Sequence, residues 1–301
     1  MSHTALTMDV EDWFHILESD AAPLPESWDR LESCIERGVS AMLEILDRHR
    51  AKATFFWLAW AARKHTALLR RCAAEGHEIA SHGSLHLLPH QCGPDAFYHD
   101  IAQARTVLED LSGGPVAGFR APGFGIRDET AWAFEMIGRA GYRYDASVFP
   151  APRAHGGLRG GQASPFRIHT AAGELLELPA PVVNVLGRPI SLFGGGYLRL
   201  APMAMIRRGI RKLRELDRPL IVYVHPRELV SDHPRLPLGA MRRFKCYVNL
   251  DSTGPKLDAI CRDHAPTTLG RIAQGLSGEA LPLFVMQGSG TQQRLLPPQA
   301  A

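Results

Sequence analysis

Hydrophobic positions follow two different periods along most of the chain. Short apolar runs that suit buried strands alternate with longer stretches in which apolar residues recur every three or four positions, as on one face of a helix. Strands are expected at residues 4–10, 53–57, 77–80, 116–120, 142–145 and 220–224. Helices are expected at residues 31–49, 61–75, 95–111, 128–140, 202–216, 257–264 and 268–276. Strands that alternate with helices in this way predict an α/β fold with a parallel sheet or barrel.

Two parts of the chain depart from this alternation. Residues 149–195 are rich in glycine, proline and alanine, and we expect them to form a loop and hairpin insertion beside the site. Residues 277–301 are expected to be a disordered tail, because the sequence after Met286 reads QGSGTQQRLLPPQAA. Residues 1–276 are therefore expected to form one domain, since α/β barrels often use roughly 200–250 residues.

The composition is that of an ordinary soluble globular protein and excludes several classes of function. Charged residues make up 22% and hydrophobic residues 45% of the 301 positions. The net charge of +3 is too small to indicate nucleic acid binding. Five cysteines without CxxC spacing predict reduced thiols and a cytoplasmic protein. We expect no secretory signal, and no transmembrane segment because no window approaches ~18 uninterrupted apolar residues.

Two histidines four residues apart follow the third expected strand. His82 and His86 lie in the segment SHGSLH, and imidazoles are the commonest protein ligands for zinc and related metals. Side chains at this spacing reach one ion if the intervening backbone makes a helical turn. A polar loop that happens to contain histidines would explain the same segment, because the chain has 14 histidines. The position of the pair after a strand end favours the metal-binding interpretation, because α/β folds have their active sites at the C-terminal ends of strands.

Polar residues also follow three other expected strands. They are Asp9, Glu11 and Asp12 at the C-terminal end of the first strand, Arg120 at the end of the fourth, and His225 after the last. Two histidines and one carboxylate form a three-ligand metal set that leaves one position open for water. A separate carboxylate can take a proton from that water, an arginine can hold this carboxylate, and another histidine can protonate a leaving amine. Together these residues predict metal-assisted hydrolysis.

Each of these residues also has a purely structural explanation. Three acids after a strand can cap a helix and interact with its positive end. Arg120 precedes a Pro-Gly turn, and His225 can be a hydrogen-bonded core residue. Asp145, which follows another strand, can be an ordinary loop acid. The predicted site therefore depends on all of these residues lying at successive strand ends.

Five motifs follow one another along the chain: TMDVED, SHGSLH, FRAPGFG, YDAS and YVHP. With the flanking phrases EGHEIASHG and GYRYDASVFP, this order resembles the polysaccharide deacetylases that have a NodB homology domain, carbohydrate esterase family four. GGGYLRL and FKCYVNLD are similar to sequences of the subgroup tied to exopolysaccharide synthesis in bacteria with exosortase-type protein sorting. The resemblance extends over residues 4–276.

This resemblance implies a distorted (β/α) barrel and a divalent metal, usually zinc. Cobalt, nickel and manganese also suit two histidines and a carboxylate. By similarity, Asp9 matches the catalytic base, and His82 and His86 match metal ligands. Arg120 matches the arginine that tethers the base, and His225 matches the general acid.

Two positions depart from the pattern of the family. Val10 follows Asp9 where a second aspartate is common, so the third metal ligand is either Glu11 or Asp12. A strand-like path turns Asp9 and Glu11 to the same side, whereas a tight turn presents Asp12, and both alternatives stay open. Asp145 corresponds to the acid that orients the catalytic histidine, although YDAS lacks the usual Asp-Trp pairing.

The activity that the resemblance implies is N-deacetylation of an N-acetylhexosamine residue in a polysaccharide or its lipid-linked precursor, as part of bacterial exopolysaccharide biosynthesis. The alternatives are an amidohydrolase acting on a formamide or ureide, and a catalytically silent carbohydrate-binding member of an assembly complex. Trp13, Phe124 and Tyr197 are the expected sugar-binding aromatic residues. The expected partners are this substrate and the synthesis machinery, without nucleic acid, in the cytoplasm at the inner face of the membrane.

Overall fold

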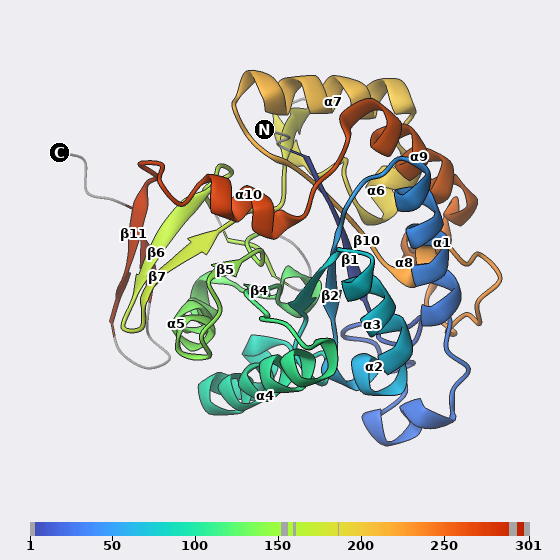
Figure 1. Cartoon of the computed structure of the whole chain (residues 1–301), viewed down its shortest axis with the longest axis horizontal. Helices are drawn as coiled ribbons and strands as arrows, with labels where there is room; N and C mark the ends of the chain where they lie inside the picture. The colour runs from blue at the N-terminus through green and yellow to red at the C-terminus, as the bar shows by residue number, and fades with distance from the viewer. Residues whose placement is uncertain (1–3, 152–155, 159–160, 186, 289–293, 298–301) are drawn as a thin grey trace.

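The central element of the structure is a ten-stranded sheet (Figure 1). The structure is a computed structural model that describes residues 4–151, 156–158, 161–185, 187–288 and 294–297. In sheet order, the strands are β10 (Leu220–Val224), β1 (Thr4–Val10), β2 (Thr54–Trp57), β3 (Glu78–Ser81), β4 (Gly118–Phe119), β5 (Tyr144–Asp145), β7 (Gly173–Glu177), β6 (Phe166–Thr170), β11 (Leu283–Gln287) and β12 (Arg294–Leu296). The run from β10 to β7 is entirely parallel.

Helices surround this curved sheet, so the fold is the expected distorted (β/α) barrel (Figure 1). They are α1 (Ile35–Arg48), α2 (Ala59–Lys64), α3 (Thr66–Ala74), α4 (Pro89–Ser112), α5 (Trp132–Arg139), α6 (Gly195–Leu200), α7 (Met203–Glu215), α8 (Ala240–Tyr247), α9 (Thr253–His264) and α10 (Leu269–Gly275). Helix α1 packs against α9, and α4 packs against α2, α3 and α5. Among the described residues, no helix combines the length and apolar character needed to span a bilayer.

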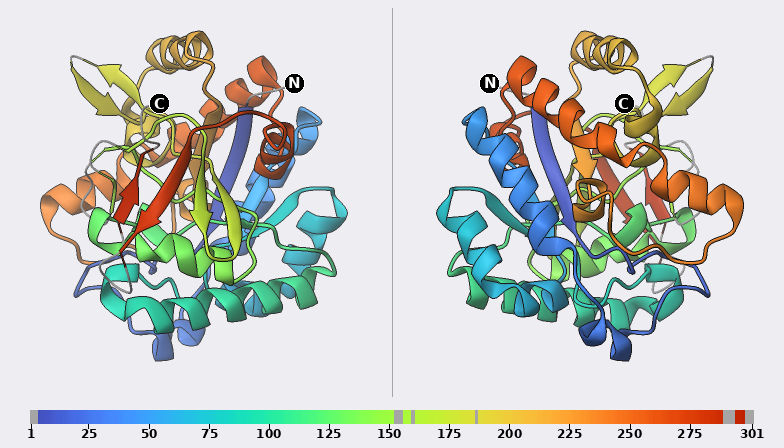
Figure 2. Two further views of the ribbon diagram at one scale, coloured as in Figure 1. Left: turned by 90° about the vertical axis from the view of Figure 1, so that its left-hand side faces the viewer. Right: turned by 90° about the vertical axis from the view of Figure 1, so that its right-hand side faces the viewer.

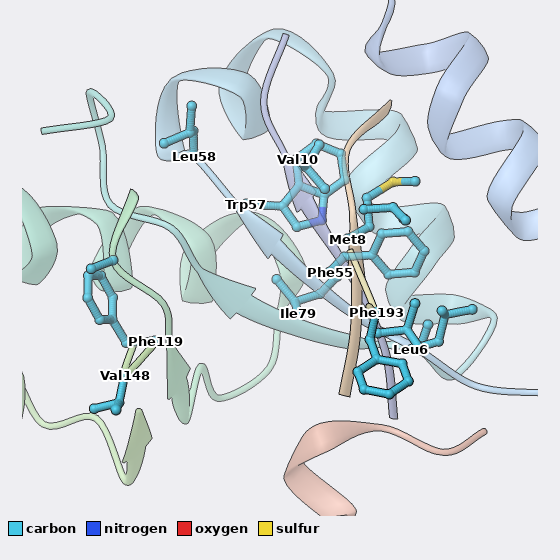
Figure 3. Close-up of a cluster of buried hydrophobic side chains, with 14 of the residues drawn as sticks. Leu6, Met8, Val10, Phe55, Trp57, Leu58, Ile79, Phe119, Val148 and Phe193 are labelled. Atoms are coloured by element: carbon cyan, nitrogen blue, oxygen red, sulfur yellow. The ribbon is translucent and has the colours of Figure 1, made fainter. Parts of the chain in front are cut away.

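Alternation along β1 separates the hydrophobic core from the interior of the barrel. Leu6, Met8 and Val10 point toward the helices and are fully buried (Figure 3). Because successive side chains of a strand point to opposite faces, Thr7 and Asp9 point to the other side. Both of these polar side chains are also buried, and their partners are described with the site below.

Helix α10 covers the end of the barrel where the strands begin. Leu269 packs in one apolar cluster with Ala5 of β1 and Ile221 of β10. The amide of Leu269 donates to Thr54 Oγ1 over 2.7 Å, and the amide of Gly270 donates to a carboxylate oxygen of Glu78. Helix α10 thus covers the N-terminal ends of these strands, and the polar residues of the candidate site lie at the C-terminal ends.

The expected insertion at residues 149–195 is only partly correct. Strands β6 and β7 form an antiparallel pair, and β7 joins the main sheet beside β5. Among the described strands of this region, the hairpin of β8 (Val183–Val185) and β9 (Arg188–Ile190) stands apart, at the edge of the molecule beside α7 (Figure 2). The described glycines and prolines that indicated a loop lie mainly outside these strands, and Gly187 lies in the turn between β8 and β9.

The expectation of a disordered tail is wrong for two segments of residues 277–301. Strand β11 pairs with β6, and β12 pairs with β11. The ring of Phe284 lies 4.5 Å from the ring of Phe166, centroid to centroid, so apolar packing holds β11 in place. Residues 289–293 and 298–301 lie outside the described part of the chain.

Most of the remaining elements were predicted with small differences in their ends. The helix expected at residues 61–75 is split into α2 and α3. Helix α4 begins earlier than expected and bends at Gly93, whose φ of 76° is not helical. Helix α8 lies in a part of the chain for which the hydrophobic pattern predicts no helix or strand.

Candidate active site

The polar residues at the strand ends come together because their strands are neighbours. Strands β10, β1, β2, β3 and β4 are hydrogen-bonded in that order, and all run in the same direction. Their C-terminal ends therefore lie along one edge of the sheet. At this edge the structure gathers most of the residues that the sequence motifs indicated.

Glu11, His82 and His86 form a buried group whose side chains can hold one metal ion. One ligand atom from each residue lies within 4.8 Å of the other two. Glu11 Oε2 is 2.5 Å from His86 Nε2 and 4.0 Å from His82 Nε2. None of the three residues is more than 8% exposed.

The ring of His82 is held by the main chain of a neighbouring strand end. Its Nδ1–H donates to the carbonyl oxygen of Arg120 over 2.7 Å, which leaves the lone pair of Nε2 directed toward Glu11. Such a contact on the second ring nitrogen orients a ligating histidine. Burial lowers the pKa of His82 to about 4, so the ring is neutral near pH 7.

His86 lies in a loop that is shaped by α4. The backbone of His86 has a φ of 59°, in the left-handed region, so the expected helical turn between the two histidines is not formed. Asp100 of α4 accepts hydrogen bonds from the amides of Ser84 and Leu85 at 2.9 and 3.1 Å. A side chain at Gly83 would come within 2.7 Å of Asp100. Asp100 thus holds this loop, a role that the sequence analysis missed.

The donor set and its burial fit a divalent metal ion. Two imidazole nitrogens and a carboxylate oxygen are a common set of zinc ligands. His86 Nε2 is buried beside Glu11 Oε2, and this 2.5 Å contact does not have the geometry of a hydrogen bond. Burial by itself would raise the pKa of Glu11, but the adjacent His86, His225 and Arg227 hold it well below the usual value. The carboxylate is therefore ionised, as a metal ligand must be.

Asp12 has a different environment from that of Glu11. Its Oδ1 accepts hydrogen bonds from the amides of Trp13 and Cys34, each at 3.0 Å. Asp12 therefore organises the turn after β1 and lies outside the metal-ligand group. Of the two alternatives for the third ligand, the structure brings Glu11 to the histidines.

Asp9 and Arg120 form a buried ion pair beside this group. Arg120 Nη1 donates to Asp9 Oδ1 over 2.7 Å and to Thr7 Oγ1 over 2.9 Å. The guanidinium group also lies 4.1 Å from the ring centroid of Phe56. Both charged side chains are at most 4% exposed, so the arginine has a fixed position from which it orients the carboxylate.

His225 lies on the far side of Glu11 and has an acidic partner of its own. Its Nδ1–H donates to Glu228 Oε2 over 3.0 Å, and its Nε2 lies 3.7 Å from Glu11 Oε1. Arg227 Nη1 donates to the same oxygen of Glu11 over 3.1 Å. Burial would raise the pKa of Glu228, but the hydrogen bond from His225 and the charge of Arg199 lower it to about 2.

Glu228, and not Asp145, contacts the catalytic histidine candidate. The Oδ1 atom of Asp145 accepts a hydrogen bond from Ser147 Oγ over 2.6 Å, and Asp145 is opposite Glu177 in the β5–β7 register. Burial raises the pKa values of both acids, and the charge of Asp145 raises that of Glu177 further. This pair was not predictable from the motifs, because β7 lies in the region expected to be an insertion. The spacing in His-Pro-Arg-Glu was the available signal for Glu228.

Two of the three expected sugar-binding aromatic residues are buried. Trp13 is 7% exposed and donates its indole N–H to the carbonyl of Glu32, whereas Phe124 is 3% exposed and packs on Tyr223. Neighbouring protein atoms therefore cover both of these rings. Tyr197 on α6 is 59% exposed.

Comparison with known families divides most of the chain into two matched regions. A polysaccharide deacetylase family model matches residues 27–144, and a model described as a domain of unknown function (DUF3473) matches residues 146–274. Residues 27–144 are therefore a polysaccharide deacetylase domain, which confirms over this part of the chain the family that the motif order indicated.

Relatives with assigned names match about a third of the chain. A chitooligosaccharide deacetylase of Azorhizobium caulinodans is 38% identical over 99 residues, which are 32% of this chain and 44% of the relative. A peptidoglycan-N-acetylglucosamine deacetylase of Bacillus cereus is 29% identical over 102 residues, 34% of this chain and 46% of the relative. The match thus spans less than half the length of these relatives.

Solved structures resemble the chain over nearly its whole length. A protein of Mycobacterium smegmatis assigned as a polysaccharide deacetylase has a TM-score of 0.55 at 19% identity, covering 89% of this chain and 94% of the other. An allantoinase has a TM-score of 0.59 at 15% identity, covering 91% and 90%. At these identities the similarity establishes the fold.

Proposed function

We propose that this protein is a metal-dependent hydrolase that removes acetyl groups from N-acetylhexosamine residues of a polysaccharide or its lipid-linked precursor. The observation that carries the proposal is the buried group of Glu11, His82 and His86. The ion pair of Asp9 with Arg120 and the side chain of His225 belong to the same strand-end site, and all of these residues come from the motifs of the deacetylase resemblance. The deacetylase domain and the names of the relatives support the same activity.

Glu11, His82 and His86 would hold the metal ion, which we propose is zinc. When bound, the ion supplies a Lewis acid for the acetamido carbonyl and lowers the pKa of a water molecule. Cobalt, nickel and manganese accept the same ligands, so metal identity is decided by measurement.

Asp9 is our candidate for the general base, because Arg120 and the strand end hold its carboxylate in place. It accepts the proton of the water that attacks the acetyl carbonyl carbon. His225 in its protonated form donates a proton to the departing sugar nitrogen, and Glu228 fixes the orientation of this ring. The products are acetate and a glucosamine-type residue.

We further propose a role in exopolysaccharide biosynthesis at the inner face of the membrane. Support comes from the motifs GGGYLRL and FKCYVNLD, and the matched domain of unknown function is compatible with this subgroup. The synthesis machinery would then supply the substrate polymer.

Acetate release from N-acetylglucosamine oligomers tests the proposed activity. The purified protein is stripped with a chelator, reloaded with zinc and assayed by coupled detection of acetate. We expect release from the zinc-loaded protein and none from the stripped protein. Hydrolysis of a formamide or ureide without acetate release would instead favour the amidohydrolase alternative, and zinc-loaded protein inactive on every amide would favour the silent one.

A further inference from the structure

Two sequence motifs have no part in the proposed mechanism, yet they contact each other in the structure. GGGYLRL forms α6 and the residue before it, and FKCYVNLD begins in α8 and continues beyond it. Both lie within residues 146–274, the region matched by the domain of unknown function. Helices α6 and α8 pack directly against each other.

The three glycines of the first motif allow this close packing. A side chain at Gly194 would come within 2.3 Å of the ring of Tyr223, which lies on β10 beside the site. Gly195 has a φ of 52°, in the left-handed region that favours glycine. A side chain at Gly196 would come within 3.2 Å of the carbonyl oxygen of Lys245 on α8. Helix α6 is thereby placed tightly between β10 and α8.

Arg199 is the residue of the motif that this packing buries. It is 4% exposed, although arginine is almost never fully buried unless it is paired. Its Nη1 and Nη2 donate to the carbonyl oxygens of Cys246 and Lys245 over 2.7 and 2.8 Å. Its Nε lies 3.2 Å from Glu228 Oε1. The planar guanidinium group therefore joins α8 to the acid that contacts His225.

Glu228 is held from both of its carboxylate oxygens. Oε1 contacts Arg199, whereas Oε2 accepts hydrogen bonds from both the backbone amide and Nδ1 of His225, each at 3.0 Å. Without Arg199, one oxygen of a buried carboxylate loses its charged partner, and rotation of the carboxylate becomes easier. The ring of His225 then loses its fixed orientation.

We propose that Arg199 is a positioning residue for the deacetylation, acting through Glu228 to aim His225 at the leaving nitrogen. The inference rests on the proposed function and extends it. It assigns to the region of unknown function a specific task, which is to supply the proton donor of the site and to brace it with α6 and α8.

The test compares Arg199→Met with Lys256→Met in the full chain. Lys256 Nζ donates to the carbonyl oxygens of Leu198 and Arg199 over 2.8 and 2.6 Å, so it anchors the same helix without contacting Glu228. We expect Arg199→Met to lower kcat on N-acetylglucosamine oligomers about 10–100-fold with KM nearly unchanged, since a general acid contributes about 10²–10⁴-fold. Lys256→Met should stay within about threefold of wild type.

A second substrate separates loss of the proton donor from general damage. Hydrolysis of 4-nitrophenyl acetate releases nitrophenolate, which leaves without a proton, so Arg199→Met should retain this activity. Arg199→Lys restores the charge without the planar fork and should recover only part of the loss. Equal losses on both substrates, or equal losses in Arg199→Met and Lys256→Met, would overturn the proposal.

The orientation of the ring can be measured without any substrate. In protein with ¹⁵N-labelled histidine, the Nδ1–H signal assigned through His225→Gln should be present in wild type and in Lys256→Met. It should be lost or shifted in Arg199→Met, and an unchanged signal would overturn the proposal. If this signal changes as expected while the wild type releases no acetate, the positioning contact stands and the proposed deacetylation fails.

Discussion

At the scale of single residues, the proposed role of Asp9 as general base requires a carboxylate that is both fixed in position and basic. Its carboxylate is buried against Arg120 and Thr7, so the position of its oxygens is fixed while its charge is balanced. Replacement by asparagine keeps the shape and removes the basic oxygen. This makes Asp9 the residue whose chemistry can be tested with the least disturbance of its surroundings.

We expect Asp9→Asn to reduce acetate release by about 10²–10⁴-fold, the range that general base catalysis contributes. Zinc content should remain that of the wild type, because Asp9 does not belong to the metal-ligand group. Asp47→Asn, on the exposed face of α1, serves as the control. Acetate release by Asp9→Asn at the wild-type rate would refute the assignment of the base.

Residues directly at strand ends were predictable, whereas their partners mostly were not. Asp9, His82, Arg120 and His225 follow recognisable apolar runs, and parallel strands bring such positions together. Arg199 depends on packing between helices that no local pattern reveals. The choice between Glu11 and Asp12 needed the path of the chain after β1, because both acids follow the strand.

At the scale of elements, β11 is the clearest departure from expectation. The segment LFVMQ is short and is followed by Gly, Ser, Thr and Gln residues typical of flexible chain. Its pairing partner β6 lies far away in sequence, inside the region expected to be an insertion. Strand pairing of this kind depends on long-range contacts that single-sequence periodicity does not contain.

Phe284→Ala tests whether β11 contributes to stability. The ring of Phe284 packs on Phe166, so its loss should lower the free energy of unfolding by about 2 kcal/mol, less than for a fully buried phenylalanine. Phe244→Ala, at a side chain that is 52% exposed, should change it by less than about 0.5 kcal/mol. Urea denaturation of both variants provides the measurement. Equal stabilities would mean that the segment is a disordered tail after all.

At the scale of the whole molecule, burial of neutral histidines makes stability depend on pH. Burial is the main cause that lowers the pKa values of His77 and His82, each to about 4. In the unfolded chain both rings titrate near 6.5. Between these two pH values the unfolded state binds more protons, so the free energy of unfolding falls as the pH decreases from 6.5 toward 4.

In metal-free protein, His77→Gln should remove the part of the pH dependence of the free energy of unfolding that His77 contributes. His77 lies directly before β3 and outside the candidate metal-ligand group, and the shift of its pKa corresponds to about 3 kcal/mol. Over the window from pH 6.5 to 4, the wild type should therefore lose about 3 kcal/mol more than the variant. Urea denaturation at several pH values measures this difference, and parallel curves for the two proteins would contradict it.

The central claim is that Glu11, His82 and His86 together bind one catalytic metal ion. Calorimetric titration of chelator-stripped protein with zinc tests it most directly, with Asp12→Asn as the neighbouring control for Glu11→Gln. We expect one zinc ion per chain for the wild type and for Asp12→Asn. For Glu11→Gln we expect the affinity for zinc to fall by more than the roughly 10–100-fold that is typical when a residue hydrogen-bonded to a metal ligand is replaced. Absence of tight binding by the wild type, or unchanged binding by Glu11→Gln, would contradict the account.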